Sequence, residues 1–280
     1  MSPTLGLRGL VKAVGGPLRR RSVLKGVTCS IPSGRVVGLL GRNGAGKTTL
    51  LRLLLGHARP DGGHVDWGRP GPPRRIWLPE GRALPELGSA ASWAGAFEPA
   101  SAARRRRLVD QLDVGGLWSR PARRLSSGER RRVELVLTLS ARADVYLLDE
   151  PTTGLDPLHL EGARAALREL AAEGATVLVS THLVLEHEDL VDPVVVLHRG
   201  RVVAQAGASE LREGCVALRP ERPVEAVLDD PSWVTTSDGR CLCRGTARRR
   251  LQDFLLGQGI GWSEEPCTLR DAFLERVGAR

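Results

Sequence analysis

The sequence predicts an α/β fold around a largely parallel sheet, followed by a small α+β unit. Two observations lead to this prediction. Between residues 35 and 213, short apolar runs typical of buried strands alternate with segments whose apolar residues recur at helical spacing. A glycine-rich loop joins the first of these strands to the first of these helices, which is the context that phosphate-binding loops require.

Length and composition allow one large domain with a small addition. The chain has 280 residues, of which 41% are hydrophobic. No run approaches the roughly 18 apolar residues of a membrane span, and the start, Met1-Ser2-Pro3-Thr4, lacks the basic-then-apolar pattern of a secretory signal. Five cysteines at irregular spacing indicate a reducing cytosol rather than a disulfide framework.

The N-terminal part predicts strands on both sides of a turn and then a strand–loop–helix unit. Strands are expected over 5–11 and 23–31. Arg35 to Leu40 is an apolar run of the kind that a buried parallel strand shows. Thr49 to Leu55 is a crowded apolar helix, and Gly56 is placed to end it.

The middle of the chain predicts a helical region and then alternating elements. Residues 57–80 are rich in proline and glycine, with one strand expected at 75–78, and residues 81–124 are dominated by alanine and arginine. The segments expected next are a helix from 125 to about 140, a strand at 145–148, a helix that Asp156-Pro157 begins and Gly174 ends, and strands at 175–180, 194–197 and 201–204.

The pattern changes near residue 214. Strand-like pieces at 215–218 and 233–236 alternate with helical pieces at 247–256 and 269–277. We therefore expect a main domain over residues 1–213, with a helical subdomain at about 81–140, and a small accessory domain over 214–280.

The glycine loop fits the phosphate-binding pattern G-x-x-x-x-G-K-[ST], and it reads Gly41-Arg42-Asn43-Gly44-Ala45-Gly46-Lys47-Thr48, with Thr49 opening the helix. Glycines let backbone N–H groups converge on an anion, and the helix dipole favours negative charge there. Lys47 is expected to reach the β- and γ-phosphates, and the Thr48 hydroxyl to ligate Mg²⁺. The alternative is a glycine-rich turn between two core elements, and the strand–loop–helix order favours the phosphate site.

Two carboxylates, Asp149 and Glu150, end the apolar strand that begins at Val145. At a strand end beside a phosphate loop, Asp149 can lie near Mg²⁺ through water, and Glu150 can orient or deprotonate an attacking water. The alternative is a purely structural pair. Their position downstream of a phosphate loop favours catalysis.

Together with three further motifs, these features resemble the ATP-binding cassette (ABC) ATPases. The motifs are Leu125-Ser126-Ser127-Gly128-Glu129, Gly154-Leu155-Asp156 and Ser180-Thr181-His182. The resemblance covers about residues 5–210, and the pentapeptide separates this family from other P-loop proteins. It implies a P-loop NTPase fold with a helical subdomain, here carrying a small C-terminal α+β appendage.

The resemblance implies a head-to-tail homodimer that binds ATP with Mg²⁺. The phosphate loop of one subunit would hold ATP, and Ser126 with the Ser127, Gly128 and Glu129 segment of the other would cap it. Asp156 would lie at the dimer seam, a role that is compatible with its being a simple helix cap. His182 would contact the γ-phosphate, unless it is a core histidine. Two of these residues, Glu150 and His182, would be catalytic.

The order of segments also resembles cassettes of drug or polyketide-type exporters. In these, the implied partner is an integral membrane permease on a separate chain, which would hold the cassette at the inner face of the membrane, on the cytoplasmic side. Glu80 stands where ABC proteins carry a Mg²⁺-ligating glutamine, and it could supply a metal oxygen beside Thr48 and Asp149. Val14 stands where an aromatic residue stacks on adenine, so base selectivity would be loose.

Net charge is +9, and two arginine runs, 104–107 and 130–132, contribute to it. Such runs indicate either a nucleic-acid or membrane surface or solvated helix faces. No aromatic residues are interleaved with them, which favours solvated faces.

Two rival functions stay open: a soluble ABC ATPase acting on nucleic acid or ribosomes, and a nucleotide-binding regulator that never hydrolyses. The pair Cys241 and Cys243 lacks a second ligand pair at zinc spacing.

Overall fold

The computed structural model describes residues 4–16, 19–81, 83–181, 189–221 and 233–278. The chain divides into two compact units, and among these residues the first unit extends to Gln205 and the second starts at Ala206. No helix within the described ranges is long and apolar enough to cross a bilayer. Each unit is considered by itself below.

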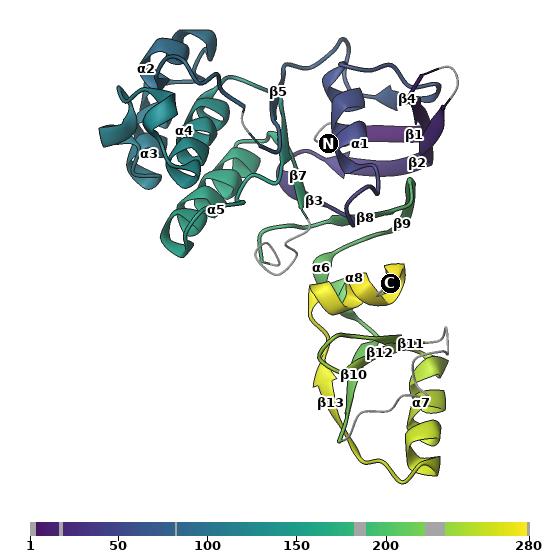
Figure 1. The fold of residues 1–280 in the computed structure, drawn as a ribbon. Helices are drawn as coiled ribbons and strands as arrows, with labels where there is room; N and C mark the ends of the chain where they lie inside the picture. Colours follow the sequence, from purple (N-terminus) through teal and green to yellow (C-terminus); the bar gives the residue numbers. More distant parts are fainter. Residues whose placement is uncertain (1–3, 17–18, 82, 182–188, 222–232, 279–280) are drawn as a thin grey trace. The chain divides into compact units, whose positions relative to one another are not determined.

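A six-stranded sheet forms the centre of the first unit (Figure 1). Its order is β5 (Arg75–Leu78), β6 (Val145–Asp149), β7 (Thr176–Thr181), β3 (Arg35–Leu40), β8 (Val194–His198) and β9 (Arg201–Ala206). The pairs from β5 across to β8 are parallel. Strands β6 and β7 are buried along their whole length, as expected for a parallel sheet covered on both faces. The parallel sheet expected from the sequence is therefore present.

A second, antiparallel sheet in this unit has the order β2 (Arg21–Pro32), β1 (Thr4–Val14) and β4 (Gly62–Asp66). The strand β4 is absent from the sequence prediction, because its two leading glycines disfavour strand locally. Pairing with β1 overrides that preference. Gly63, with φ 75°, lies so close to the backbone of Gly9 that no side chain fits there.

Helices cover the parallel sheet from two sides. Helix α1 (Lys47–Leu55) buries Leu50, Leu51 and Leu54 in the core that it shares with the antiparallel sheet. On the other side, Figure 1 shows a helical region beside α5 (Pro157–Ala172). Its members are α2 (Ala90–Trp93), α3 (Ala102–Gln111), α4 (Ser127–Ser140) and three 3₁₀ turns, Ala94–Ala96, Gly115–Leu117 and Ala122–Arg124.

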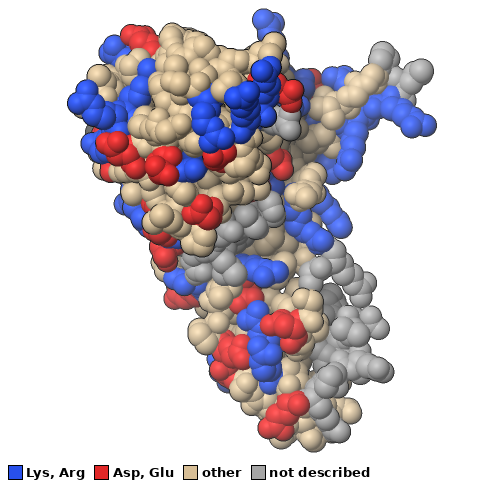
Figure 2. Space-filling view, turned by 60° about the vertical axis from the view of Figure 1, so that its left-hand side comes forward, with Lys and Arg blue, Asp and Glu red and all other residues tan. Residues whose placement is uncertain are grey.

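The interpretation of the second arginine run as a solvated face is wrong. Arg130 and Arg131 are 7% and 6% exposed, and both lie on the buried side of α4. Their guanidinium groups donate to backbone carbonyls of neighbouring loops. In the first run, Arg104 and Arg107 form ion pairs with Glu173. On the face in Figure 2, red carboxylates likewise lie among the blue basic side chains.

The second unit is an antiparallel sheet with helices. Its strand order is β11 (Trp233–Thr235), β12 (Cys241–Arg244), β10 (Cys215–Pro220) and β13 (Trp262–Pro266), and its helices are α6 (Ala208–Arg212), α7 (Thr246–Gly257) and α8 (Leu269–Val277). The boundary lies before α6, earlier than residue 214, because α6 packs on α8 and buries Leu211. Strands β12 and β13 are absent from the sequence prediction.

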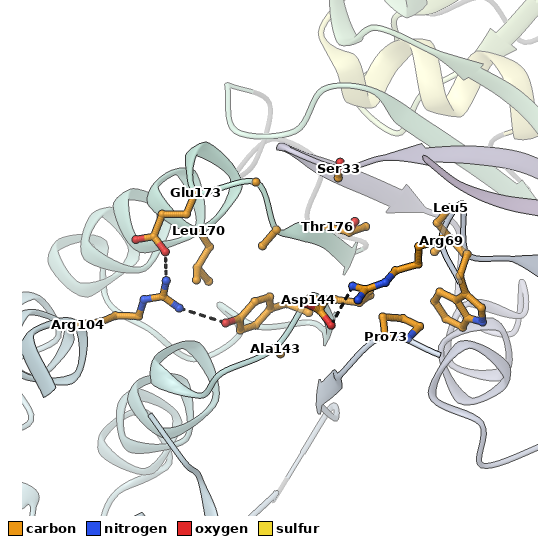
Figure 3. Close-up of a pocket in the computed structure, with 15 residues that line it drawn as sticks. Leu5, Ser33, Arg69, Pro73, Arg104, Ala143, Asp144, Leu170, Glu173 and Thr176 are labelled. Atoms are coloured by element: carbon orange, nitrogen blue, oxygen red, sulfur yellow. Dashed lines mark hydrogen bonds and ion pairs between the residues drawn. The ribbon is translucent and has the colours of Figure 1, made fainter. Parts of the chain in front are cut away.

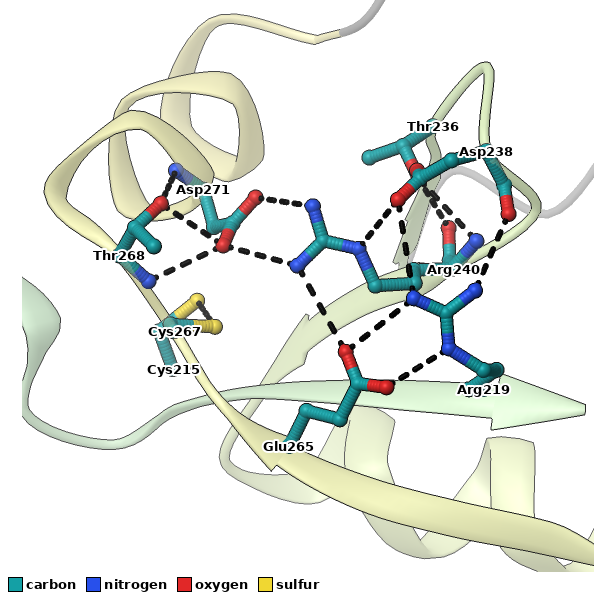
Figure 4. Close-up of polar contacts among 9 residues, drawn as sticks. All are labelled: Cys215, Arg219, Thr236, Asp238, Arg240, Glu265, Cys267, Thr268 and Asp271. Atoms are coloured by element: carbon teal, nitrogen blue, oxygen red, sulfur yellow. Dashed lines mark hydrogen bonds and ion pairs between the residues drawn. The ribbon is translucent and has the colours of Figure 1, made fainter. Parts of the chain in front are cut away.

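A polar cluster fixes α8 to this sheet (Figure 4). Arg240, directly before β12, forms a bidentate ion pair with Asp271 at 3.1 Å for both contacts, and Asp271 is only 1% exposed. The same carboxylate accepts from the backbone N–H and hydroxyl of Thr268. Both oxygens of this buried carboxylate therefore accept hydrogen bonds, which offset the free-energy cost of removing its charge from water.

Candidate nucleotide-binding and catalytic site

The loop between β3 and α1 has the geometry of an anion cradle. Gly44 and Gly46 have φ 77° and 112°, a region that glycine adopts without strain. A Cβ on Gly46 would lie 2.8 Å from Leu24 Cδ2, and one on Gly41 2.6 Å from the Leu197 carbonyl. Helix α1 has no side-chain cap and no acidic residue in its first turn. Its first N–H groups are thus oriented toward the loop, where an anion can accept from them.

Lys47 and Thr48 open α1 beside the carboxylates. The Lys47 ammonium is buried, donates to the Gly41 carbonyl at 2.8 Å and lies 4.0 Å from Glu150 Oε1. The Thr48 hydroxyl donates to Asp149 Oδ2 at 2.8 Å. The structure therefore brings together the four residues that the sequence assigned to phosphate, metal and water. Hydroxyl and carboxylate oxygens side by side are ligands that fit Mg²⁺.

Asp149 and Glu150 are held by the end of the neighbouring strand. The register of β6 and β7 pairs Asp149 with Ser180, whose hydroxyl donates to the Asp149 carboxylate. The Glu150 N–H donates to the Ser180 carbonyl at 2.9 Å, and the Thr181 hydroxyl donates to Glu150 Oε2 at 3.1 Å. The sequence interpretation quoted Ser180 and Thr181 only as neighbours of His182. Parallel pairing of the two strands is the signal that could have assigned them here.

His182 lies outside the described residues, so both its predicted catalytic role and its proximity to Glu150 stay predictions. Glu80 is exposed and lines a groove of about 360 Å³ together with Glu150 and Thr153. Strands β5 and β6 are parallel neighbours, so Glu80 and Glu150 follow strands that end at the same edge of the sheet. Val14, at the end of β1, is 42% exposed.

The segment Ser126–Glu129 forms a capping box at the start of α4. Glu129 Oε2 accepts from the Ser126 N–H at 2.8 Å, and the Ser126 hydroxyl accepts from the Glu129 N–H at 3.2 Å. The Ser126 N–H and the Arg120 guanidinium hold the pKa of the Glu129 carboxyl below its ordinary value. The charge of Glu129 is therefore satisfied within the chain.

This helix start lies away from the phosphate loop of the same chain. Ser126 and Ser127 are exposed, and a Cβ on Gly128 would lie 2.9 Å from the Gly154 carbonyl. In Figure 1, α4 and α1 are well separated, with β5 and β7 between them. Within one chain, Ser126 and Ser127 at the start of α4 are thus accessible to solvent, and the neighbouring Gly128 packs beside Gly154.

Asp156 caps α5 and holds His159. Its Oδ1 accepts from the N–H groups of Leu158 and His159, both at 3.1 Å. The His159 ring, 2.6 Å from the other carboxylate oxygen, lowers the pKa of Asp156. Arg132 Nη1 lies 2.7 Å from the second ring nitrogen of His159. The cap predicted at Asp156 is present, and it connects α5 to α4.

A separate pocket of about 200 Å³ lies where β6 and β7 begin (Figure 3). Its charged groups are paired: Arg104 with Glu173, and Arg69 with Asp144 at 3.2 Å. Open parallel sheets bind ligands at the carboxyl ends of their strands. This pocket is at the opposite ends, so it is not the nucleotide site.

Among the described residues, no group of three or more histidine, cysteine or acidic side chains is placed to hold a metal ion. Cys241 and Cys243 are buried, and burial raises the pKa of the Cys243 thiol to about 12. Cys215 and Cys267 lie with their Sγ atoms 2.6 Å apart.

Comparisons with known proteins agree with this site. A family model described as ABC transporter matches residues 24–153. The Nod factor export ATP-binding protein I of Ralstonia nicotianae is 36% identical over 308 residues, covering 99% of this chain and 94% of its own length. The daunorubicin/doxorubicin resistance ATP-binding protein DrrA of Streptomyces peucetius is 34% identical over 224 residues, covering 73% of this chain and 65% of its own.

Solved structures share the fold of the first unit. An ATP-binding subunit of an ABC transporter has a TM-score of 0.65 and 27% identity, covering 74% of this chain and 91% of its own. A bacterial ABC transporter cassette described as dimeric has a TM-score of 0.63 and 22% identity, covering 72% of this chain and 98% of its own. The chain therefore belongs to the ABC transporter family, as an ATP-binding subunit that hydrolyses ATP.

Proposed function

We propose that this chain drives export by hydrolysing ATP as a head-to-tail dimer bound to a separate integral membrane permease at the cytoplasmic face. One observation carries the catalytic part of the proposal. Lys47, Thr48, Asp149 and Glu150 meet at the carboxyl end of the sheet, with 2.8 Å between the Thr48 hydroxyl and Asp149 and 4.0 Å between the Lys47 ammonium and Glu150.

The phosphate loop would grip the triphosphate. Backbone N–H groups from Gly41 to Thr49 would donate to phosphate oxygens, and Lys47 would exchange the Gly41 carbonyl for them. The positive φ values of Gly44 and Gly46 support this role, because glycine adopts them without strain and so allows the loop to turn its N–H groups toward an anion. Thr48 and Asp149 would hold Mg²⁺, with Glu80 as a further oxygen donor. When bound, the ion neutralises charge on the phosphate oxygens.

Glu150 would act as the general base. Its carboxylate is only 3% exposed, and it faces the Thr181 hydroxyl on one oxygen and the Lys47 ammonium on the other. A carboxylate at this position can accept the proton of an attacking water. His182 would contact the γ-phosphate, a role that the family resemblance implies for it.

The dimer follows from the separation of two half-sites. The N-terminus of α4 exposes Ser126 and Ser127 on a helix that Figure 1 shows well apart from α1. The helix N–H groups that its capping box leaves unused can donate to an anion. A second copy in head-to-tail orientation would supply the missing half. Asp156 and the adjacent Gly154 would then lie at the seam, since Gly154 is next to Gly128.

Export is supported by the relatives. Two of them are named for Nod factor export and for daunorubicin/doxorubicin resistance. The groove beside Glu80, lined also by Glu86 and Arg123, would receive the permease. The rival function on nucleic acid lacks a basic surface at 130–132, where two arginines are buried.

The test is reconstitution. Purified protein with Mg²⁺ should release phosphate from ATP, and a permease with several membrane spans, expressed with it, should co-purify and raise the rate. A purified protein that neither retains nucleotide nor releases phosphate would overturn the proposal. Stimulation by DNA or RNA that salt abolishes would favour the nucleic-acid function instead.

A further inference from the structure

A buried ion pair on α4 has no part in the chemistry described above. Arg131 and Glu134 are one helical turn apart, and their side chains are 7% and 2% exposed. Arg131 Nη1 lies 3.2 Å from Glu134 Oε2. Burial lowers the pKa of the Arg131 guanidinium, against the opposing effect of Glu134, and an arginine stays charged nevertheless.

Every N–H of the Arg131 guanidinium has an acceptor. Nε donates to the Pro151 carbonyl at 3.0 Å, and Nη1 donates to the Pro79 carbonyl at 3.1 Å as well as to Glu134. Nη2 donates to the carbonyls of Asp149 at 3.0 Å and Glu150 at 2.6 Å. The guanidinium therefore spans the turn that carries both catalytic carboxylates and the loop that follows β5.

Glu134 connects the pair to that loop a second time. Its Oε1 accepts from the Ala83 N–H at 2.9 Å and from the Leu84 N–H at 3.4 Å. Two side chains of one helix thus join residues 79 and 83–84 to the turn 149–151. Replacing a buried ion pair by apolar residues is often neutral or stabilising, so stability alone is a weak reason for this arrangement.

The turn needs such support. Glu150 has φ 49°, a left-handed conformation that is strained for a non-glycine residue and persists only where the surrounding structure enforces it. Its N–H is fixed by the Ser180 carbonyl at 2.9 Å, and its carbonyl is fixed by Arg131 at 2.6 Å. These two bonds hold both sides of the residue, and so set the direction of its carboxylate toward Lys47.

We propose that Arg131 is a positioning residue that orients Glu150 for hydrolysis, and that Glu134 couples this orientation to residues 79–81 and 83–84 of the loop after β5. The inference rests on the proposed role of Glu150 as general base. A displacement of the loop moves Glu134 and Pro79 together, shifts the guanidinium, and turns the Glu150 carbonyl and carboxylate. The groove lined by Glu80, Glu134 and Glu150 is where a bound partner can cause that displacement.

The experiment compares two lysine variants of the full chain. Arg131→Lys keeps the charge but cannot bridge five acceptors. Arg105→Lys is the matched control: Arg105, on α3, is partly buried and donates to the Ala94 and Phe97 carbonyls, which belong neither to the loop after β5 nor to the turn 149–151. We expect Arg131→Lys to lower kcat by about ten- to a hundredfold with the KM for ATP within about twofold. Arg105→Lys should change kcat by less than about twofold.

A double variant separates positioning from simple destabilisation. In a Glu150→Gln background, Arg131→Lys should lower the residual rate no further, because it acts through Glu150. Glu134→Gln keeps an acceptor for the Ala83 N–H but removes the charge that faces Arg131, and we expect it to lower kcat as well. It is the variant to measure if Arg131→Lys does not fold.

Three results would overturn the inference. They are equal losses of kcat in both lysine variants, an additional loss of the same size in the Glu150→Gln background, and wild-type kcat in Glu134→Gln or Arg131→Lys. If Glu150→Gln lowers kcat strongly while any of these results is found, only the inference fails. Wild-type turnover in Glu150→Gln itself would remove the proposed base, and the inference with it.

Discussion

Replacing Glu150 by glutamine tests the proposed base most cleanly. In the unsubstituted chain, the Thr181 hydroxyl donates to Glu150 Oε2 at 3.1 Å. Glutamine has nearly the same shape and keeps an oxygen that can accept this bond, but it lacks the basic carboxylate. Loss of a general base costs about 10²- to 10⁴-fold in rate, which corresponds to about 3–5 kcal/mol of transition-state stabilisation. We therefore expect kcat to fall by that factor.

Nucleotide affinity should not fall with it. Lys47 and Glu150 are 4.0 Å apart and both are nearly buried, where opposite unit charges attract by about 4 kcal/mol at an effective dielectric constant of 20. The substitution removes this attraction, so the Lys47 ammonium is more available to phosphate. ATP binding should be unchanged or tighter, and the ATP-bound dimer should accumulate.

The assay combines single-turnover hydrolysis with light scattering after gel filtration in Mg²⁺ and ATP. A slow, dimeric, nucleotide-loaded variant agrees with the reasoning. The matched control is Glu173→Gln, because that carboxylate pairs with Arg104 and Arg107 at the pocket on the opposite ends of the strands. A Glu150→Gln protein that turns over ATP at the wild-type rate would refute the assignment, as would one that loses ATP binding.

The remaining predictions concern the metal, acid stability and two thiols. Thr48→Val should raise the Mg²⁺ concentration for half-maximal activity by about tenfold, since it removes the hydroxyl beside Asp149; an unchanged Mg²⁺ titration contradicts this. Hydrogen bonds, first from Thr236, lower the pKa of Asp238 from 3.8 to about 2, so its stabilisation is present above about pH 4 and is lost toward pH 2. Urea unfolding of Asp238→Asn should then be less pH-dependent over that range than wild type, and equal slopes would count against it. Oxidised glutathione should convert Cys215 and Cys267 into an intramolecular disulfide by thiol–disulfide exchange, and mass spectrometry that finds both thiols still alkylated would disprove it.

Much of the fold was predictable because its signals are local. The apolar runs of β3, β6 and β7 and the caps at Ser126 and Asp156 each lie within a few consecutive residues. Strand β4 was not predictable, because its glycines disfavour strand and only pairing with β1 makes it one. Strand β13 likewise carries two acidic residues, Glu264 and Glu265, whose charges are satisfied by arginines from other elements.

The residues of the site likewise fall into those that local motifs predict and those that only the folded structure brings together. The phosphate loop and the Asp149-Glu150 pair are contiguous motifs, and the structure brings them together. Arg131 was read as part of a charged surface run, because an arginine in sequence gives no sign of the carbonyls that surround it. Its partners come from segments about 20 and 50 residues away, and only the packing of α4 against two loops brings them within reach.

Mixing two inactive variants tests the shared site most directly. Lys47→Ala damages the phosphate loop, and Ser127→Glu places a negative charge at the exposed start of α4, where helix formation tolerates it but a phosphate does not. In an equal mixture, half of the dimers are heterodimers with one intact composite site, so about a quarter of wild-type activity should return. A mixture that stays as inactive as each variant alone would contradict a site built from two chains.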